Sequence, residues 1–297
     1  MREIYAEIAR RLRAGERFAV ATLVQTREAK ASMPGTSLVV DARGAFAGDI
    51  GAGCHEGTIV ERAVAMLAAA GAHAQRMRFD LDDELLIGSG CGASLDVVLW
   101  MPVQEFAKTA DAIAVGTRDI AFTLEGSTVE IPRRLRLAIV GATALAAHLT
   151  GMARRADFIV TIVDPRPPFA SRERHPQADE IVVGWPDDAS EHLESADAIC
   201  VLSHDVKIDL PALRAALATH ARYVGLLGNR RVQRARREAL RAEGYDDERL
   251  ARVFGPTGLD VGAQTDGQTA VSILAEILAV LGARPGTPLR DSSGSIH

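Results

Sequence analysis

Residues 135–146 of this 297-residue chain, LRLAIVGATALA, join an apolar strand pattern to a glycine turn and then to a helical pattern. The alternation of strand and helix patterns continues from there, and further strands are expected near residues 158–163, 180–183, 197–202 and 222–226. Strands that alternate with helices form right-handed β-α-β units and a parallel sheet. Residues 134–284 are therefore predicted to be a Rossmann-like α/β domain with a doubly wound parallel sheet.

The turn after the first of these strands is where a dinucleotide would bind. Gly141 keeps the first glycine of such a fingerprint, and Asp164 follows it by 23 residues, at a strand end where a carboxylate can hold ribose hydroxyls. Thr143 stands where the second glycine belongs, and a β-branched residue there obstructs the approach of a pyrophosphate to the backbone. The pattern favours the fold, and it leaves NAD(P) binding by a nicotinamide-dependent oxidoreductase as an alternative.

Other loops at the carboxyl ends of the predicted strands carry polar groups, and ligands collect in that crevice of an open α/β sheet. The loops are residues 203–205 (SHD), 228–231 (GNRR) and 255–260 (GPTGLD). Arg230 lies at a helix start, where backbone N–H groups and a guanidinium suit a phosphate or carboxylate. The arginines from Arg234 onward are interpreted as a solvated helix face. His204 is either a ligand-binding residue or a hydrogen-bonded core residue, and Cys200 is expected to pack in an apolar strand.

The N-terminal part places two of the three cysteines in glycine turns, at residues 51–57 (GAGCHEG) and 88–92 (GSGCG). Glycine allows a backbone to approach a ligand closely. Cys54 precedes a predicted helix start, which lowers the pKa of a thiol, and Glu56 could cap the helix or accept a proton. Thiolates favour soft or redox-active metals, and the lack of a Cys-x-x-Cys pattern disfavours zinc. Two buried small residues in tight turns remain an equal interpretation.

The composition is that of a soluble globular protein, with 47% hydrophobic and 25% charged residues and a formal net charge of −5. Neither nucleic-acid binding nor membrane binding is expected from these values. The first residues open directly into a helical pattern without a signal sequence, so a cytoplasmic protein with free thiols is expected. Residues 1–107 are predicted to form an α/β cysteine-motif domain, 108–133 an interdomain linker with a short helix and a hairpin, and 285–297 a disordered tail.

Several motifs in order resemble the XdhC/CoxI family, accessory proteins of molybdenum hydroxylases such as xanthine dehydrogenase, over residues 14–283. The matching stretches are residues 34–35 (PG), 53–57 (GCHEG), 90–92 (GCG), 223–231 (YVGLLGNRR), 258–263 (GLDVGA) and 272–277 (SILAEI). The chain departs from the family at residues 141–144 (GATA), where members commonly carry Gly-x-Gly-His.

The resemblance implies a maturation chaperone without turnover of its own. It would bind and protect the molybdenum cofactor (molybdopterin or its cytosine dinucleotide form), assist its sulfuration with a cysteine desulfurase-type sulfur donor, and deliver it to an apo molybdenum hydroxylase. Cys54 and Cys91 would hold the molybdenum, and a homodimer is expected. The implied cofactor-binding residues are Gly53, Cys54, Glu56, Gly57, Cys91, Gly92, Gly141, Asp164, His204 and Arg230. A scaffold that brings a sulfurtransferase to the apo-enzyme is a further alternative.

Overall fold

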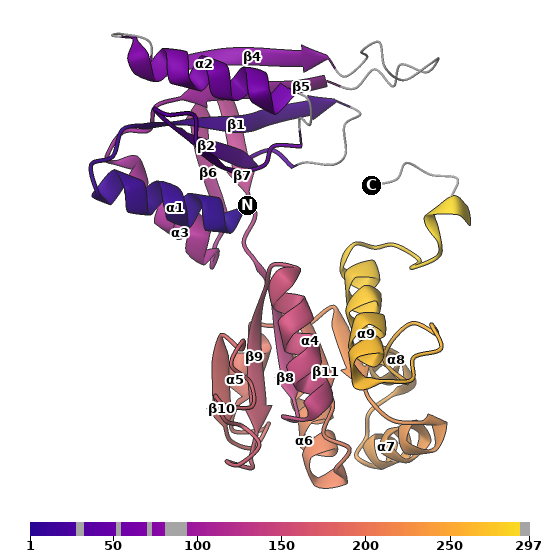
Figure 1. The fold of residues 1–297 in the computed structure, drawn as a ribbon. Coiled ribbons are helices and arrows are strands. Elements are labelled where there is room, and N and C mark those ends of the chain that lie inside the picture. Colours follow the sequence, from indigo (N-terminus) through magenta and orange to yellow (C-terminus); the bar gives the residue numbers. More distant parts are fainter. Residues whose placement is uncertain (28–32, 52–54, 70–72, 81–93, 292–297) are drawn as a thin grey trace. The chain divides into compact units, whose positions relative to one another are not determined.

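The structure is a computed structural model that describes residues 1–27, 33–51, 55–69, 73–80 and 94–291. The chain divides into two compact units, Met1–Arg133 and Arg134–Ser293. Each unit has its own sheet and its own core, and each is described by itself (Figure 1).

The first unit is built on a five-stranded antiparallel sheet with the order β3-β2-β1-β5-β4. Its strands are β1 (Phe18–Arg27), β2 (Ser37–Asp41), β3 (Phe46–Gly48), β4 (Ala74–Asp80) and β5 (Ser94–Trp100). The helix α2 (Glu56–Ala68) covers one face, and α1 (Arg2–Arg13) and α3 (Phe106–Val115) cover the other (Figure 1). Side chains of β1 alternate between the two cores, because successive residues of a strand point to opposite faces.

The stretch 108–133, which the sequence predicts to be an interdomain linker, contributes to the first unit. It contains most of α3 and the hairpin of β6 (Ile120–Leu124) and β7 (Ser127–Ile131). Val129 and Ile131 of the hairpin are buried in the same core as α1. A two-stranded hairpin is marginal in isolation, so this one gains its stability by packing on the larger sheet.

The second unit has a six-stranded sheet with the order β10-β9-β8-β11-β12-β13, in which every paired strand is parallel. Its strands are β8 (Leu135–Val140), β9 (Phe158–Asp164), β10 (Glu180–Val183), β11 (Ala198–Val201), β12 (Tyr223–Leu226) and β13 (Val253–Phe254). The order reverses between β8 and β11, which is the switch point of a doubly wound fold. The predicted Rossmann-like sheet is confirmed.

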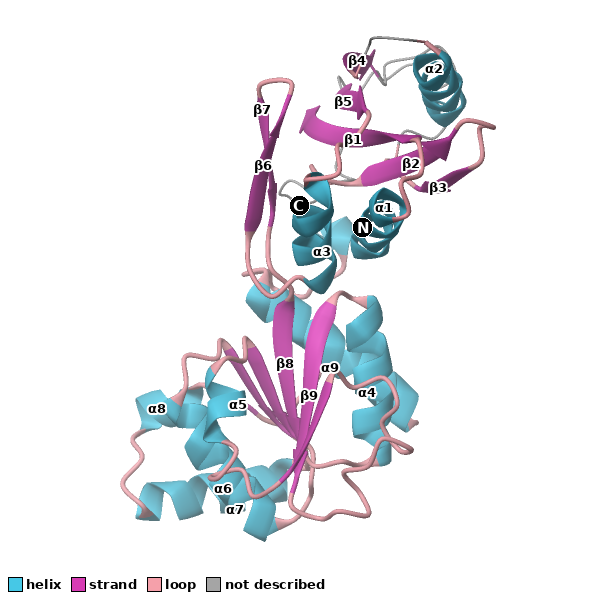
Figure 2. Ribbon diagram, turned by 90° about the vertical axis from the view of Figure 1, so that its left-hand side faces the viewer, coloured by secondary structure: helices cyan, strands magenta, loops and turns pink. Residues whose placement is uncertain are grey.

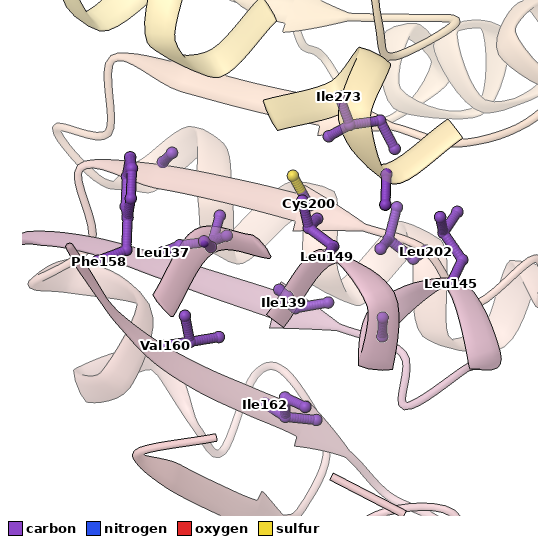
Figure 3. Close-up of a cluster of buried hydrophobic side chains, with 14 of the residues drawn as sticks. Leu137, Ile139, Leu145, Leu149, Phe158, Val160, Ile162, Cys200, Leu202 and Ile273 are labelled. Atoms are coloured by element: carbon purple, nitrogen blue, oxygen red, sulfur yellow. The ribbon is translucent and has the colours of Figure 1, made fainter. Parts of the chain in front are cut away.

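Helices cover both faces of the second sheet, as Figure 2 shows. The helices are α4 (Ala144–Arg155), α5 (Ser190–Glu194), α6 (Val206–Ala218), α7 (Arg230–Ala242), α8 (Asp247–Ala251) and α9 (Asp266–Leu281). On the face of α4 and α9, Cys200 lies in the core with Leu149 and Ile273 (Figure 3). The predicted packing role of Cys200 is confirmed, and burial raises the pKa of its thiol far above the usual value.

The C-terminal stretch after α9 contains the short 3₁₀ helix Leu289–Asp291, and residues 292–297 of the predicted disordered tail lie outside the described residues. Among the helices that the structure describes, none combines the length and the apolar character that a membrane span requires.

Candidate functional site

The two cysteine motifs lie only partly within the described residues. Gly53 and Cys54 lie outside them, as do Cys91 and Gly92, so the predicted thiol site is not described. Glu56 and Gly57 are described at the start of α2. The remaining predicted site residues, Gly141, Asp164, His204 and Arg230, belong to the second unit.

The described residues that flank the two cysteine motifs meet at one end of the first sheet. Asp80, the last residue of β4, pairs with Ser94, the first residue of β5, and Ser94 also pairs with the last residue of β1. The His55 ring, just before α2, stacks on Phe79 of β4 with ring centroids 4.8 Å apart. The start of α2 and both ends of the stretch that contains Cys91 are therefore neighbours.

A pair of carboxyl groups lies at the start of α2. The pKa of Glu56 is raised because burial disfavours its charged form, and because the Asp49 carboxyl both hydrogen-bonds to it and repels its charge. The backbone N–H of Ile50 stabilises the charged form and opposes this shift. The side chain of His55, the N-cap residue, makes no capping hydrogen bond, and both interpretations of Glu56, as a cap and as a proton acceptor, stay predictions. A carboxyl group with a raised pKa beside a cysteine motif can take or give a proton.

Gly57 follows Glu56 in the first turn of α2. It is exposed, and a Cβ atom built on it would meet no atom of the described residues within 4 Å. Packing in the described residues therefore does not require a glycine here. A bare backbone in the first turn of a helix leaves N–H groups accessible to an approaching anion.

The Pro34-Gly35 turn is held by a chain of buried hydroxyl groups. Tyr5 Oη donates to the carbonyl oxygen of Gly35 at 2.8 Å, and Ser37 Oγ lies 3.0 Å from Thr22 Oγ1. Gly35 has φ +92°, and a Cβ there would lie 2.9 Å from Ile131. Both the backbone conformation and the hairpin beside it therefore require glycine.

Gly141 is required by packing between two strand ends. It has φ +104°, and a Cβ there would lie 2.6 Å from the backbone nitrogen of Ser203, after β11. Thr143 caps α4, because its Oγ1 accepts a hydrogen bond from the Ala146 backbone at 3.2 Å. This turn brings the ends of β8 and β11 into contact, and the predicted role of Gly141 in binding a cofactor stays a prediction.

Asp164 is fully buried and its oxygens are occupied. Its carboxylate accepts hydrogen bonds from Ala142 N at 2.8 Å, and from Arg166 N, Nε and Nη2 at 2.9, 2.9 and 2.7 Å. Burial by itself would raise the pKa of Asp164, but the hydrogen bonds from Arg166 and Ala142 hold it below its usual value. In this structure the Asp164 carboxylate holds its own loop, and its predicted role in binding a ligand stays a prediction.

His204 follows β11 in an exposed turn, with φ +59°. Of its two interpretations, the buried core residue is excluded. The neighbouring Ser203 hydroxyl donates to buried Asp209 at 2.5 Å, and Arg236 of α7 donates to the same carboxylate twice at 3.1 Å. This network ties the His204 turn to α6 and α7.

Arg230 is the first residue of α7 and is exposed. Asn229 caps the helix by accepting hydrogen bonds from the backbone of Arg231 at 3.0 Å and of Val232 at 3.1 Å. In the described part of the chain, Arg230 has no ion-pair or hydrogen-bond partner, so its guanidinium is available to an anion.

The expectation that the arginines from Arg234 onward form a solvated face is wrong for part of α7. Arg236 pairs with buried Asp209, and Arg237 donates to the carbonyl oxygens of Leu250 at 2.9 Å and Val253 at 2.8 Å. These side chains fasten α7 to neighbouring elements, because long arginine side chains can reach main-chain acceptors across a helix packing interface.

Sequence reasoning missed Glu276, which positions the loop after β13. Its Oε2 accepts hydrogen bonds from Tyr223 Oη at 2.6 Å and from Gly258 N at 2.8 Å, and Tyr223 Oη also lies 2.5 Å from Thr257 Oγ1. The sequence signal that could have found Glu276 is its position as a single carboxylate within the apolar pattern of α9. A half-buried charge requires hydrogen-bond partners, so such a residue is expected to hold a neighbouring segment.

The residues that the structure describes contain no cluster of three or more histidine, cysteine, aspartate or glutamate side chains arranged to hold a metal ion.

Comparisons with known proteins match both units. A family model described as the XdhC Rossmann domain matches residues 137–277, and one described as the XdhC and CoxI family matches residues 11–80. Similar curated proteins include the molybdenum cofactor insertion chaperone PaoD of Escherichia coli (strain K12), which is 23% identical over 91% of this chain and 85% of that protein.

A protein of Bacillus subtilis (strain 168), whose name describes it as a probable xanthine dehydrogenase subunit, is 25% identical over 60% of this chain and 52% of its own length. The chain spans about half the length of two curated relatives that it matches, this one included. A crystal structure of a protein from Bacillus halodurans described as a xanthine dehydrogenase covers 97% of this chain and 98% of its own, with a TM-score of 0.75 and 20% identity, which supports the fold.

Proposed function

Because this chain belongs to the XdhC and CoxI family, we propose that it is an accessory protein that binds the molybdenum cofactor as cargo for a hydroxylase of the xanthine dehydrogenase type. The name of the E. coli relative supports the role in cofactor insertion, and the name of the B. subtilis relative supports the type of client enzyme. The protein would protect the cofactor, assist its sulfuration by a cysteine desulfurase-type donor, and deliver it to the apo-enzyme as a homodimer.

The observation that carries this proposal is the meeting of the motif flanks beside the Glu56–Asp49 pair. Cys54 and Cys91 would supply soft thiolate ligands to the molybdenum, which is the ligand type that such a metal prefers. A thiol must lose its proton to become a ligand. Glu56 would take up that proton, because its raised pKa makes its carboxylate a stronger base than that of an ordinary glutamate.

Within the second unit, the N-terminus of α7 would hold a phosphate group. Arg230 offers an unpaired guanidinium among the described residues, and the helix start offers N–H groups of the first turn. Thr143 as a helix cap and the occupied carboxylate of Asp164 do not favour a nicotinamide dinucleotide in the same crevice. A single phosphate group is the better match.

The test is the molybdenum and pterin content of the purified protein. We expect the wild type to carry both, and Cys54→Ala and Cys91→Ala to lose most of the molybdenum. Cys200→Ala is the matched control, because this buried cysteine lies in an apolar core and should leave the cofactor content unchanged. If both motif variants retain the wild-type content, the thiols are not ligands and the assignment is wrong.

A thermal shift experiment tests the alternatives on the same samples. Stabilisation by micromolar NADH or NADPH would favour a nicotinamide-dependent enzyme. Binding of the apo-hydroxylase without affinity for any small molecule would favour a scaffold instead.

A further inference from the structure

The crossover between β9 and β10 differs from the usual pattern of a doubly wound sheet. Residues 165–179 connect these two parallel strands, and the structure describes turns and bends there but no helix. Ala170 and Ala178 of this segment pack in the core beneath α4, so the segment lies on the same face as α4. A non-helical crossover covers that face incompletely, and a cavity of about 460 Å³ lies between α4 and the segment.

The cavity is lined by polar groups from both sides. Its lining consists of residues Ala147, His148, Thr150, Gly151 and Met152 of α4, and Glu173, Arg174, His175, Pro176 and Gln177 of the crossover. Its volume is within the range of about 300–1,000 Å³ of small-molecule pockets.

His175 places a buried imidazole at this cavity. Its side chain is 1% exposed, and neither ring nitrogen has a hydrogen-bond partner in the part of the chain that the structure describes. Main-chain groups of Ala142 and Phe169 face the ring without reaching hydrogen-bond geometry. Burial lowers the pKa of His175, so the neutral ring offers one donor and one acceptor. Two unmatched polar atoms cost free energy, which a ligand with a donor and an acceptor would recover.

Two more side chains at the cavity complement a base with an exocyclic amino group. Glu173 is exposed, and hydrogen bonds from its own backbone and from Ser171 lower its pKa, so its carboxylate stays charged. A Cβ on Gly151 would overlap Gln177 Oε1, so the bare helix backbone makes room for this amide. A carboxylate accepts from an amino group such as N4 of cytosine, and an amide can both donate and accept.

Arg174 adds a positive charge to the lining of the cavity. The Arg174 guanidinium lies 5.3 Å from the centre of the exposed Phe169 ring, and Arg166 lies 4.2 Å from the same ring. Among the described residues Arg174 has no carboxylate partner, whereas Arg166 forms an ion pair with Asp164. Arg174 is therefore free to pair with a phosphate.

We propose that the cavity between α4 and the β9–β10 crossover binds a nucleoside monophosphate whose base carries an amino group. The base would contact Glu173, His175 and Gln177, and the phosphate would contact Arg174. The proposed site includes neither the cysteine motifs nor Arg230, and it does not depend on the proposed cofactor function.

The experiment is calorimetric titration of the full-length protein with four probes: CMP and AMP, which carry an amino group, and UMP and IMP, which carry an oxygen in its place. We expect CMP or AMP to bind at least about tenfold more tightly than its oxygen counterpart, because the carboxylate would repel the carbonyl oxygen. A preference for CMP would point to a cytosine ligand, and a preference for AMP to an adenine ligand.

Variants locate the site. Glu173→Gln should reduce the discrimination between amino and oxygen bases about tenfold, the size expected for one hydrogen bond to a charged group. Arg174→Ala should weaken all binding, and Arg155→Ala, an exposed arginine of α4 outside the cavity, should not. Glu238→Gln, at an exposed glutamate of α7, is the control for Glu173→Gln.

The ring of His175 gives an independent readout. Its imidazole nitrogen resonances should shift on addition of the preferred nucleotide, and should shift less with its oxygen counterpart at the same concentration. The proposal is wrong if none of the four probes binds, or if binding persists with unchanged discrimination in Glu173→Gln. These titrations use free nucleotides and do not require bound molybdenum. If the wild-type protein contained no molybdenum, this would contradict the proposed function but not the proposed nucleotide site.

Discussion

Removing the Arg166 side chain should weaken the switch-point region of the second sheet by an amount that the structure defines. Asp164 is completely buried, and Arg166 supplies three of the four hydrogen bonds to its carboxylate, two of them from the guanidinium. In Arg166→Ala the carboxylate keeps only the two backbone N–H donors. The variant therefore leaves a buried negative charge without its counter-ion.

The expected cost lies between the values for exposed and buried ion pairs. Loss of one partner from a buried pair costs about 3–5 kcal/mol, and an exposed pair contributes about 0–1 kcal/mol. The Arg166 side chain is 35% exposed and Asp164 is not exposed at all. We expect Arg166→Ala to lower the free energy of opening around β8 and β9 by about 2–3 kcal/mol.

The sign of the pH dependence follows from the pKa of Asp164. That pKa is lowered in the folded state. The ionised carboxylate therefore stabilises the fold at pH values above the pKa of an unfolded aspartate, about 3.9. The stabilisation is lost as the pH falls through the lower folded value. In Arg166→Ala the folded pKa should rise, and the stability gained between acidic and neutral pH should shrink.

The assay is native-state hydrogen exchange of the full-length protein, followed in the peptides that cover β8 and β9. A double-mutant cycle with Asp164→Asn isolates the pair, because in that background Arg166→Ala should cost less than about 1 kcal/mol. Arg155→Ala, an exposed arginine of α4, is the control for loss of charge. A coupling energy below about 0.5 kcal/mol would refute the assignment of Arg166 as the partner that keeps Asp164 buried.

Three other predictions concern separate parts of the chain. Tyr223→Phe removes a buried hydroxyl that donates to the Glu276 carboxylate of α9. Hydrogen exchange in the loop after β13 should therefore accelerate, with a loss of about 1–3 kcal/mol in the free energy of opening. Gly141→Ala places a methyl group 2.6 Å from backbone and should lower the melting temperature, whereas Gly267→Ala, with its nearest contact at 3.9 Å, should not. Wild-type stability should fall as the pH rises through the raised pKa of Glu56, so Glu56→Gln should remove this fall and Glu61→Gln, on the same helix, should leave it unchanged.

Hydrophobic patterns in the sequence were enough to predict the architecture of the second unit. The strand at 135–140, the turn at Gly141 and the helix that follows are local features, set by apolar spacing and by a backbone conformation that glycine adopts readily. Repetition of this unit fixes a parallel sheet, because a short crossover helix can return the chain only in one direction and with one hand. The placement of Cys200 in the core followed from the same periodicity.

The roles of individual polar residues could not be read in this way. Asp164 stands where a ribose-binding carboxylate belongs, yet its partner Arg166 covers it. Glu276 and Tyr223 are 53 residues apart in the chain and become partners only because α9 packs beside β12. The same holds for Arg236 and Asp209, which join two helices that no local pattern connects.

The sequence by itself therefore determined the α/β class, the order of the strand and helix patterns in the second unit, and the family, because these depend on near neighbours along the chain and on motifs in order. Only the tertiary structure decided which charged groups are free and which are occupied. Hydrogen bonding and desolvation depend on atoms brought together from distant segments. Among the described residues they leave Arg230 and Arg174 without a carboxylate partner, whereas the Asp164 carboxylate accepts four hydrogen bonds.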